Sequence, residues 1–277
     1  MTGDELWTED WDKFRQDYFD LYRSFNPLRF DAKEWAREAQ KDGFGYVMFT
    51  TKHHDGFCLY DSAYSDYKVT NPRCPYSQSD QPYIVKALFD ALRERQLGVV
   101  VYFSKSDWHN DDYWENCGIG HYTSRNTTYD TEEKPEKWAR FREFAHNQVM
   151  ELATGYGPVD VFGFDAHQVF AGSKQDVHMK QLHEKIHQID PNVICIDRQT
   201  WDICETIKTL EDCVPAKHLD IPFECVFALG QSYAYLFDDE YSPLRTVLYV
   251  AIDVIATGGN FLIDLAPSRM ADSPPVG

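Results

Sequence analysis

Segments with apolar residues at helical spacing alternate along this chain with short, continuous apolar runs. One helical segment, DAKEWAREAQKDG, begins with Asp31 as an N-cap residue and ends at Gly43, a common stop signal. The continuous runs are rich in Val, Ile, Phe and Tyr, which favours buried β-strands. We predict helices over 31–43, 84–98, 136–157, 178–190 and 242–259, each paired with a strand, over 46–54, 99–107, 159–165, 193–198 and 260–267.

This alternation of strands with helices of ten or more residues indicates βαβ units and a parallel sheet. The chain has 277 residues, which is enough for one large domain with a sizeable core. We therefore predict an α/β fold, a (β/α)8-like TIM barrel, built as a single domain over residues 1–277. A doubly wound open sheet is the alternative, and the absence of a G-x-G-x-x-G motif or a P-loop after any strand weakens it.

The net charge, the apolar runs and the cysteines exclude several classes of protein and binding partner. The formal net charge of −18 argues against a nucleic-acid partner, because nucleic-acid binding needs a basic surface. No run approaches the about 18 apolar residues of a membrane-spanning helix, and the acidic start MTGDELWTED does not resemble a signal peptide. The seven cysteines are odd in number and form no CxxC pair, which disfavours a zinc ribbon and a complete disulfide framework. A loop disulfide between Cys204 and Cys213 remains an alternative.

Ionisable and aromatic side chains gather where the predicted strands end. In barrel enzymes the C-terminal ends of the strands carry the chemistry, so we expect these side chains to meet at one mouth. They are Lys52, His53, His54 and Asp55; Ser104, Asp107, Trp108 and His109; Asp165; and Asp197 with Arg198.

Asp165 ends the apolar run VDVFGFD, where a carboxylate is costly unless it is paired. If Asp165 is a nucleophile, a second carboxyl group is needed: retaining glycosidases use one carboxylate to attack the anomeric carbon and another to protonate the leaving oxygen. Glu205, Glu211 and Glu224 lie downstream, and composition alone does not rank them.

Several of these side chains allow more than one interpretation. His53 and His54 suit sugar contacts better than a shared metal ion, because consecutive strand residues point to opposite faces. Trp108 either contacts the ligand or packs inside a capped loop. Arg198 either pairs with Asp197 or donates hydrogen bonds near Asp165.

Taken together, these segments resemble the family 29 glycoside hydrolases, the α-L-fucosidases. The resemblance runs in order along nearly the whole chain after residue 24. It rests on FNPLRFDAKEWAREAQKDGFGYVMFTTKHHDGFCLYDS (25–62), VVVYFSKSDWH (99–109), YGPVDVFGFD (156–165), ICIDR (194–198), IPFECVFALGQSYAY (221–235) and GGNFLIDLAPS (258–268).

The resemblance implies a catalytic (β/α)8-like barrel that removes terminal α-L-fucose from glycans with retention of configuration. The C-terminal β-sandwich that the family often carries is not expected in this chain. It makes Asp165 the nucleophile and Glu211, in IKTLED, the acid/base, with Glu224 in IPFEC as the reserve. The expected partner is a fucosylated oligosaccharide or glycoconjugate, without a metal or cofactor. The family suggests a periplasmic, secreted or lysosomal location. The residues expected to hold the sugar are His53, His54, Tyr102, Trp108 and Arg198.

The chain also departs from the family pattern. The first strand, which ends in an HWG-like motif in the family, is missing, and Glu5 and Trp7 match that region only weakly. Gly163 stands where the family has an aromatic residue two positions before the nucleophile, and Ala166 stands where it has glycine. Asp264 replaces the usual Asn. These departures motivate a second hypothesis, a catalytically impaired sugar-binding barrel; a metal-dependent hydrolase using His53, His54 and Asp165 is a third.

Overall fold

The computed structural model describes residues 10–115, 125–198 and 207–267. The chain divides into two compact units. The first contains Met1–Asn26 and Ala32–Val193, and the second contains Pro27–Asp31 and Ile194–Gly277.

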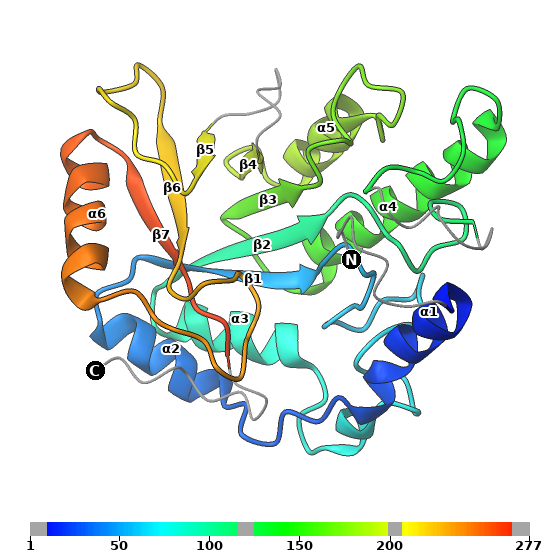
Figure 1. The fold of residues 1–277 in the computed structure, drawn as a ribbon, viewed down its shortest axis with the longest axis horizontal. Helices are drawn as coiled ribbons and strands as arrows, with labels where there is room; N and C mark the ends of the chain where they lie inside the picture. Colours follow the sequence, from blue (N-terminus) through cyan, green and yellow to red (C-terminus); the bar gives the residue numbers. More distant parts are fainter. Residues whose placement is uncertain (1–9, 116–124, 199–206, 268–277) are drawn as a thin grey trace. The chain divides into compact units, whose positions relative to one another are not determined.

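The first unit contains a parallel sheet, with β1, β2 and β3 side by side in that order (Figure 1). The register pairs Tyr102 with Gly163 and Ser104 with Asp165, so the polar ends of β2 and β3 lie at the same level. The elements of the unit are α1 (Trp11–Phe19), η1 (Asp20–Ser24), α2 (Ala32–Lys41), β1 (Tyr46–Lys52), η2 (Pro75–Gln78), α3 (Ile84–Glu94), β2 (Gly98–Ser104), α4 (Pro135–Gly155), β3 (Val161–Asp165) and α5 (Met179–Ile189).

The second unit contains another parallel sheet, in which β6 pairs with β5 on one side and with β7 on the other. Helix α6 packs on β7, and its Val254 belongs to a small core with Phe223 and Cys225 of β6 (Figure 1). The elements are β4 (Ile194–Asp197), β5 (Lys208–Glu211), β6 (Phe223–Ala228), α6 (Leu244–Ala256) and β7 (Asn260–Asp264).

Burial follows the apolar runs most closely in β2. Val99 and Val101 are fully buried, and every residue of β2 after Gly98 is buried, so both faces of the strand are covered as predicted. Strand β1 is only partly buried over its first five residues. Its place at the end of the β1–β2–β3 order, with one paired neighbour in this unit, accounts for that difference.

All five predicted helices and their strands are present, with shorter boundaries. Five elements were not predicted: α1, the short helices η1 and η2, and the strands β5 and β6. The strands β5 and β6 carry charged residues inside short runs, KTLE and FECVFA, which obscures the apolar signal. In the described residues before β1 there are helices and no strand, consistent with the missing first strand.

Two further findings concern the described residues alone. None of their helices is long and apolar enough to cross a membrane. Cys213 is a free, exposed thiol. Its proposed partner Cys204 lies outside the described residues, as do Glu5, Trp7 and Glu205.

Candidate active site

The Asp165 carboxylate is held at the C-terminal end of β3 by two hydrogen bonds. The Tyr102 hydroxyl donates to Oδ2, and the Ala166 backbone N–H donates to Oδ1 at 2.6 Å. The side chain keeps 21% of its surface exposed, so it remains accessible from solution. Because Tyr102 and Asp165 come from neighbouring strands in register, the sheet itself aligns the phenol with the carboxylate.

His53 and His54 lie just beyond the end of β1 and face the same carboxylate. One ring nitrogen of each and one oxygen of Asp165 lie within 4.8 Å of one another. The His53 ring is parallel to that of Tyr102, with 5.7 Å between ring centroids, and is exposed. The expected alternation of faces does not separate the two histidines, because β1 ends at Lys52.

His54 is buried, and its environment keeps it neutral. Burial lowers its pKa to about 3, with smaller lowering contributions from His53, Arg125 and Lys52 against the raising effect of Asp165. Its Nε2 lies 3.9 Å from Asp165 Oδ2. A neutral imidazole has one donor and one acceptor nitrogen, which suits hydrogen bonding to a sugar hydroxyl.

Trp108 lies behind His54 and is itself buried. Its backbone N–H donates to the His54 carbonyl at 2.8 Å, and its ring centroid lies 5.3 Å from that of His54. On its other side it stacks on Trp114 at 4.9 Å. Among the described residues no hydrogen-bond partner for Trp108 Nε1 is found. Trp108 therefore packs inside the loop, and its ring contacts the histidine.

A buried ion pair between Lys52 and Asp107 connects the end of β1 with the loop after β2. Lys52 Nζ donates to Asp107 Oδ2 at 3.1 Å and to Gln148 Oε1 at 3.0 Å, and it has no exposed surface. The other oxygen of Asp107 accepts the backbone N–H groups of His109 and Asn110, so the ion pair ties the end of β1 to the loop after β2. Gly56, at φ +86°, passes so close to Asp107 that a Cβ there would lie 2.2 Å from Oδ1.

The structure accounts for Gly163 through the packing of its neighbours. A Cβ at this position would lie 3.2 Å from Met48 Cε and 3.4 Å from the Val101 carbonyl. The Met48 side chain therefore occupies the space beside β3, and a large aromatic side chain at position 163 would have to displace it. Ala166 is strained for a different reason: its φ is +87°, a conformation that glycine adopts far more easily.

In the second unit, Arg198 follows β4 and forms an ion pair with Glu211, the last residue of β5. Glu211 is 31% exposed. Glu224 differs: it is buried within β6, where the Thr209 hydroxyl donates to it at 3.3 Å. Because the register pairs Glu211 with Val226, Glu211 lies two residues, about 6.6 Å, nearer the C-terminal edge of the sheet than Glu224.

Asp264 ends β7 at the same edge of the second sheet. Burial raises the pKa of its carboxyl to about 6, against a lowering effect from Arg198. No partner for its Oδ2 is found within the described ranges. An Asn in this place would be uncharged, so the substitution adds a titratable group beside Arg198.

Within the first unit, the structure brings Asp165, Tyr102, His53 and His54 together, with Trp108 behind them. Within the second, it joins Arg198 to Glu211 and sets Glu224 apart. Sequence reasoning placed Ser104 among the strand-end residues without a specific role and did not single out Ser106; the hydroxyls of both contact His54. Their position in YFSKSDWH, at a strand end, was the available signal.

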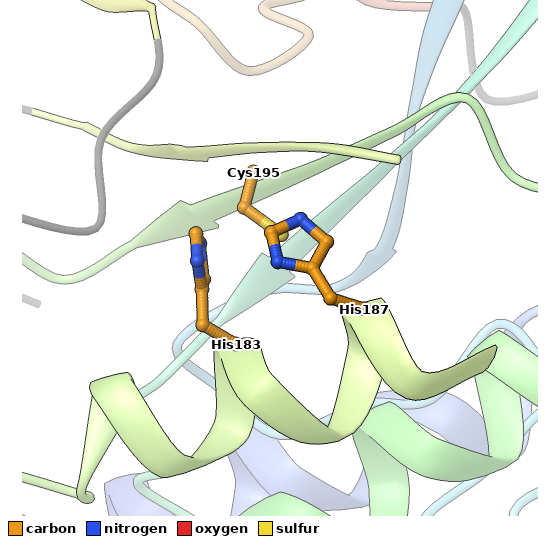
Figure 2. A group of neighbouring side chains, drawn as sticks. All are labelled: His183, His187 and Cys195. Carbon is orange, nitrogen blue, oxygen red and sulfur yellow. The ribbon is translucent and has the colours of Figure 1, made fainter. Parts of the chain in front are cut away.

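Two groups of side chains in the described part of the chain bring potential metal ligands together. His53, His54 and Asp165 offer three ligand atoms, although Tyr102 already binds the carboxylate. Figure 2 shows His183 and His187 projecting from the same side of α5, with 5.2 Å between their ring centroids. The ring of His187 is fixed by a 3.0 Å hydrogen bond from Nε2 to the Val193 carbonyl. Strand-end carboxylate, phenol and imidazole groups favour binding of a polar organic ligand at the first group.

A parallel α/β fold that presents a carboxylate at a strand end beside imidazole and phenol groups fits the class of glycoside hydrolases. The family model for α-L-fucosidase matches residues 5–275, and the chain belongs to that family. The predicted resemblance is thereby confirmed.

Known relatives agree with this assignment. The chain is 28% identical over 170 residues to α-L-fucosidase 1 of Arabidopsis thaliana, covering 61% of this chain and 29% of the relative. It is 25% identical over 268 residues to an α-L-fucosidase of Dictyostelium discoideum, covering 93% and 54%. The chain thus spans about a third to a half of the length of these curated relatives.

Solved structures confirm the predicted TIM-barrel-like fold class. α-L-Fucosidase isoenzyme 1 from Paenibacillus thiaminolyticus is similar at a TM-score of 0.79 and 28% identity, covering 99% of this chain and 66% of that one. A family 29 α-L-fucosidase from Bacteroides thetaiotaomicron is similar at a TM-score of 0.79 and 26% identity, covering 96% and 61%. A trapped covalent intermediate has been solved for an α-L-fucosidase from the same organism, at a TM-score of 0.76 and 26% identity.

Proposed function

We propose that this protein is a retaining exo-glycosidase that hydrolyses terminal α-L-fucose from fucosylated oligosaccharides or glycoconjugates. In this proposal the two units form one catalytic domain. The observation that carries it is the Asp165 carboxylate, accessible and fixed by Tyr102 and the Ala166 amide at the end of a buried strand. The trapped covalent intermediate of the related fucosidase supports a retaining mechanism for the family.

The reaction proceeds in two displacements. Asp165 Oδ attacks C1 of the fucosyl residue, the C1–O bond to the aglycone breaks, and Glu211 gives its proton to the departing oxygen. Glu211 then removes a proton from water, the water oxygen attacks C1, and the Asp165–C1 bond breaks. The free sugar leaves with its original anomeric configuration, and both carboxyl groups return to their starting protonation states.

The other residues bind the sugar. His53 and neutral His54 offer ring nitrogens to hydroxyl groups of the fucose beside Asp165. Tyr102 shares its hydroxyl with the nucleophile, which holds the carboxylate for attack. Arg198, paired with Glu211, places a guanidinium donor at the strand end that supplies the acid/base, and Trp108 supports His54 from behind.

The test is the Asp165→Ala variant, assayed on an aryl α-L-fucoside. We expect the rate to fall by several orders of magnitude, because the covalent step has no other nucleophile. Added azide should restore turnover and give the β-fucosyl azide, since azide enters from the face that Asp165 occupied. The matched control is Asp90→Ala on the exposed face of α3, which should keep wild-type activity. Near-wild-type hydrolysis by Asp165→Ala would remove the nucleophile assignment.

A sugar-binding protein without turnover is the second candidate, and the strained Ala166 beside the nucleophile favours it. In that case calorimetry would detect fucose binding by the wild-type protein, while a panel of aryl and disaccharide α-L-fucosides would show no hydrolysis. The same binding would be lost when His54 is replaced by Ala, because the imidazole contributes to both functions.

A further inference from the structure

His54 is held on the side away from Asp165 by two serine hydroxyls. Its Nδ1 lies 2.5 Å from Ser104 Oγ and 2.9 Å from Ser106 Oγ, and the two hydroxyls lie 3.1 Å from each other. Both serines are fully buried, and His54 is nearly so. The second nitrogen, Nε2, points the other way, with Asp165 Oδ2 at 3.9 Å. The imidazole therefore bridges a buried hydroxyl pair and the candidate nucleophile.

The strands place the serines where they can act on the nucleophile through His54. Ser104 is the last residue of β2 and is the register partner of Asp165 in β3. The next backbone amide, that of Lys105, donates to the Asp165 carbonyl at 3.0 Å, which fixes the two strand ends against each other. The Ser104 hydroxyl thus belongs to the same rigid strand end as the carboxylate.

Electrostatics determines which nitrogen of the neutral ring carries the proton. With the proton on Nδ1, the lone pair of Nε2 would face the anionic carboxylate of Asp165, which is unfavourable. With the proton on Nε2, the N–H dipole faces the carboxylate, and Nδ1 accepts a hydrogen bond from a serine. The Ser106 hydroxyl can then donate to Nδ1 at 2.9 Å. The Ser104 hydroxyl lies 2.5 Å from Nδ1 and 2.9 Å from the Ser106 backbone carbonyl, and it donates its one proton to one of these two acceptors.

We propose that Ser104 and Ser106 are positioning residues that fix His54 as the Nε2–H tautomer, directed at Asp165 and at the sugar that binds beside it. This inference rests on the proposed function for its catalytic consequence, whereas the tautomer is a property of the free protein. His53 differs from His54 in being exposed, with its ring parallel to that of Tyr102. The serine pair therefore acts on one of the two adjacent histidines.

The first experiment reads the tautomer directly by ¹⁵N-detected imidazole NMR of the wild-type protein at neutral pH, with the His54 signals assigned from the loss of signals in His54→Gln. We expect a protonated Nε2 and an unprotonated Nδ1 whose chemical shift shows an accepted hydrogen bond. In Ser104→Ala/Ser106→Ala, the Nδ1 signal should move toward the position of a free acceptor nitrogen. A protonated Nδ1 in the wild type, or an Nδ1 signal that both substitutions leave unmoved, overturns the inference.

The second experiment measures kinetics on an aryl α-L-fucoside. Partners that orient metal-bound histidines are worth about 10–100-fold in activity, and we expect a loss of similar size in kcat/KM for the double variant. Ser62→Ala is the matched control, because Ser62 is also fully buried and donates to Glu151, away from His54; it should stay within about twofold of the wild type. If the double variant also stays within twofold after its Nδ1 signal has moved, the serines do not position His54 for catalysis.

The two experiments separate this inference from the proposed function. Should the wild-type protein hydrolyse no fucoside while showing the Nε2–H tautomer and the serine-dependent Nδ1 signal, the proposed function fails and the structural inference stands. Should the protein hydrolyse fucosides while His54 carries its proton on Nδ1, the function stands and the inference fails. If the double variant does not fold, single Ser106→Ala removes the hydroxyl 2.9 Å from Nδ1 and keeps the strand residue Ser104, and the Nδ1 signal should move in the same direction by a smaller amount.

Discussion

The two units present their candidate catalytic carboxyl groups in contrasting ways. Asp165 is fixed through both oxygens, by a phenol from the neighbouring strand and by the next backbone amide. Glu211 is more exposed and pairs with the guanidinium of Arg198. A nucleophile gains from being held in one place, whereas an acid/base has to reach a leaving oxygen and exchange protons with water. The contrast therefore matches the different roles proposed for the two units.

The largest effect expected in the second unit concerns the choice between Glu211 and Glu224. Loss of a general acid costs about 10²–10⁴-fold, and we expect Glu211→Gln to lose about 10³-fold on a disaccharide α-L-fucoside. The loss should be much smaller on a dinitrophenyl fucoside, whose leaving group needs no proton. Glu224→Gln is the matched control, and we expect a less than tenfold change on both substrates. The opposite order of the two variants would exchange the roles of the two residues.

A smaller effect concerns Asp264, the titratable group at the edge of the second sheet. Its folded pKa of about 6 lies above the unfolded value of 3.8, so the folded state holds the proton more tightly. The resulting stability is fully present below pH 4 and is lost as the pH rises through 6. Asp264→Asn should remove this loss. We expect the free energy of unfolding of the variant to exceed that of the wild type by about 1–2 kcal/mol at pH 7, after allowance for solvent screening.

Urea denaturation at pH 4, 5, 6, 7 and 8 measures this prediction. The difference in unfolding free energy between Asp264→Asn and the wild type should grow from pH 4 to pH 7. Asp90→Asn, on the exposed face of α3, should give a difference that does not grow in this way. A pH-independent difference for Asp264→Asn would show that the carboxyl titrates alike in both states.

The smallest effect concerns the backbone beside the nucleophile. Ala166→Gly should relieve the strain of a positive φ. The substitution also removes one buried methyl group and raises the entropy of the unfolded chain, both of which lower stability. We expect a net increase of about 0.5–1 kcal/mol in the free energy of unfolding. The urea midpoint should rise while the slope stays constant. Ala36→Gly, a fully buried alanine within α2, should instead lose stability. If both variants lose stability alike, the strain at Ala166 is negligible.

The fold could be predicted largely from the apolar pattern, because long amphipathic helices and fully apolar strands such as β2 have strong signals. The pattern missed β5 and β6, where Lys208, Glu211 and Glu224 interrupt the apolar run. It also missed α1, WDKFRQDYF, a short and largely polar helix in which Trp11 and Phe19 are the buried residues. In each of these elements the burial of one or a few side chains stabilises a structure that the local composition does not indicate.

The candidate site could be predicted only as a set of residue types at strand ends. Asp165, His53 and His54 follow from that pattern, and the family resemblance supplied their roles. The hydrogen bond from Tyr102 to Asp165, the ion pair of Arg198 with Glu211 and the serines behind His54 depend on strand register. Register is set by pairing between distant segments, so the local sequence does not contain it.

The buried Lys52 has a consequence for chemical labelling of the site. Its amine has no exposed surface and is held by Asp107 and Gln148, so an amine-reactive reagent reaches it only after those contacts break. Because Asp107 also carries the loop that leads from Trp108, any opening that frees Lys52 also loosens the support of His54. The rate at which Lys52 is modified therefore measures how often its contacts with Asp107 and Gln148 open. Exposed surface lysines react without such an opening.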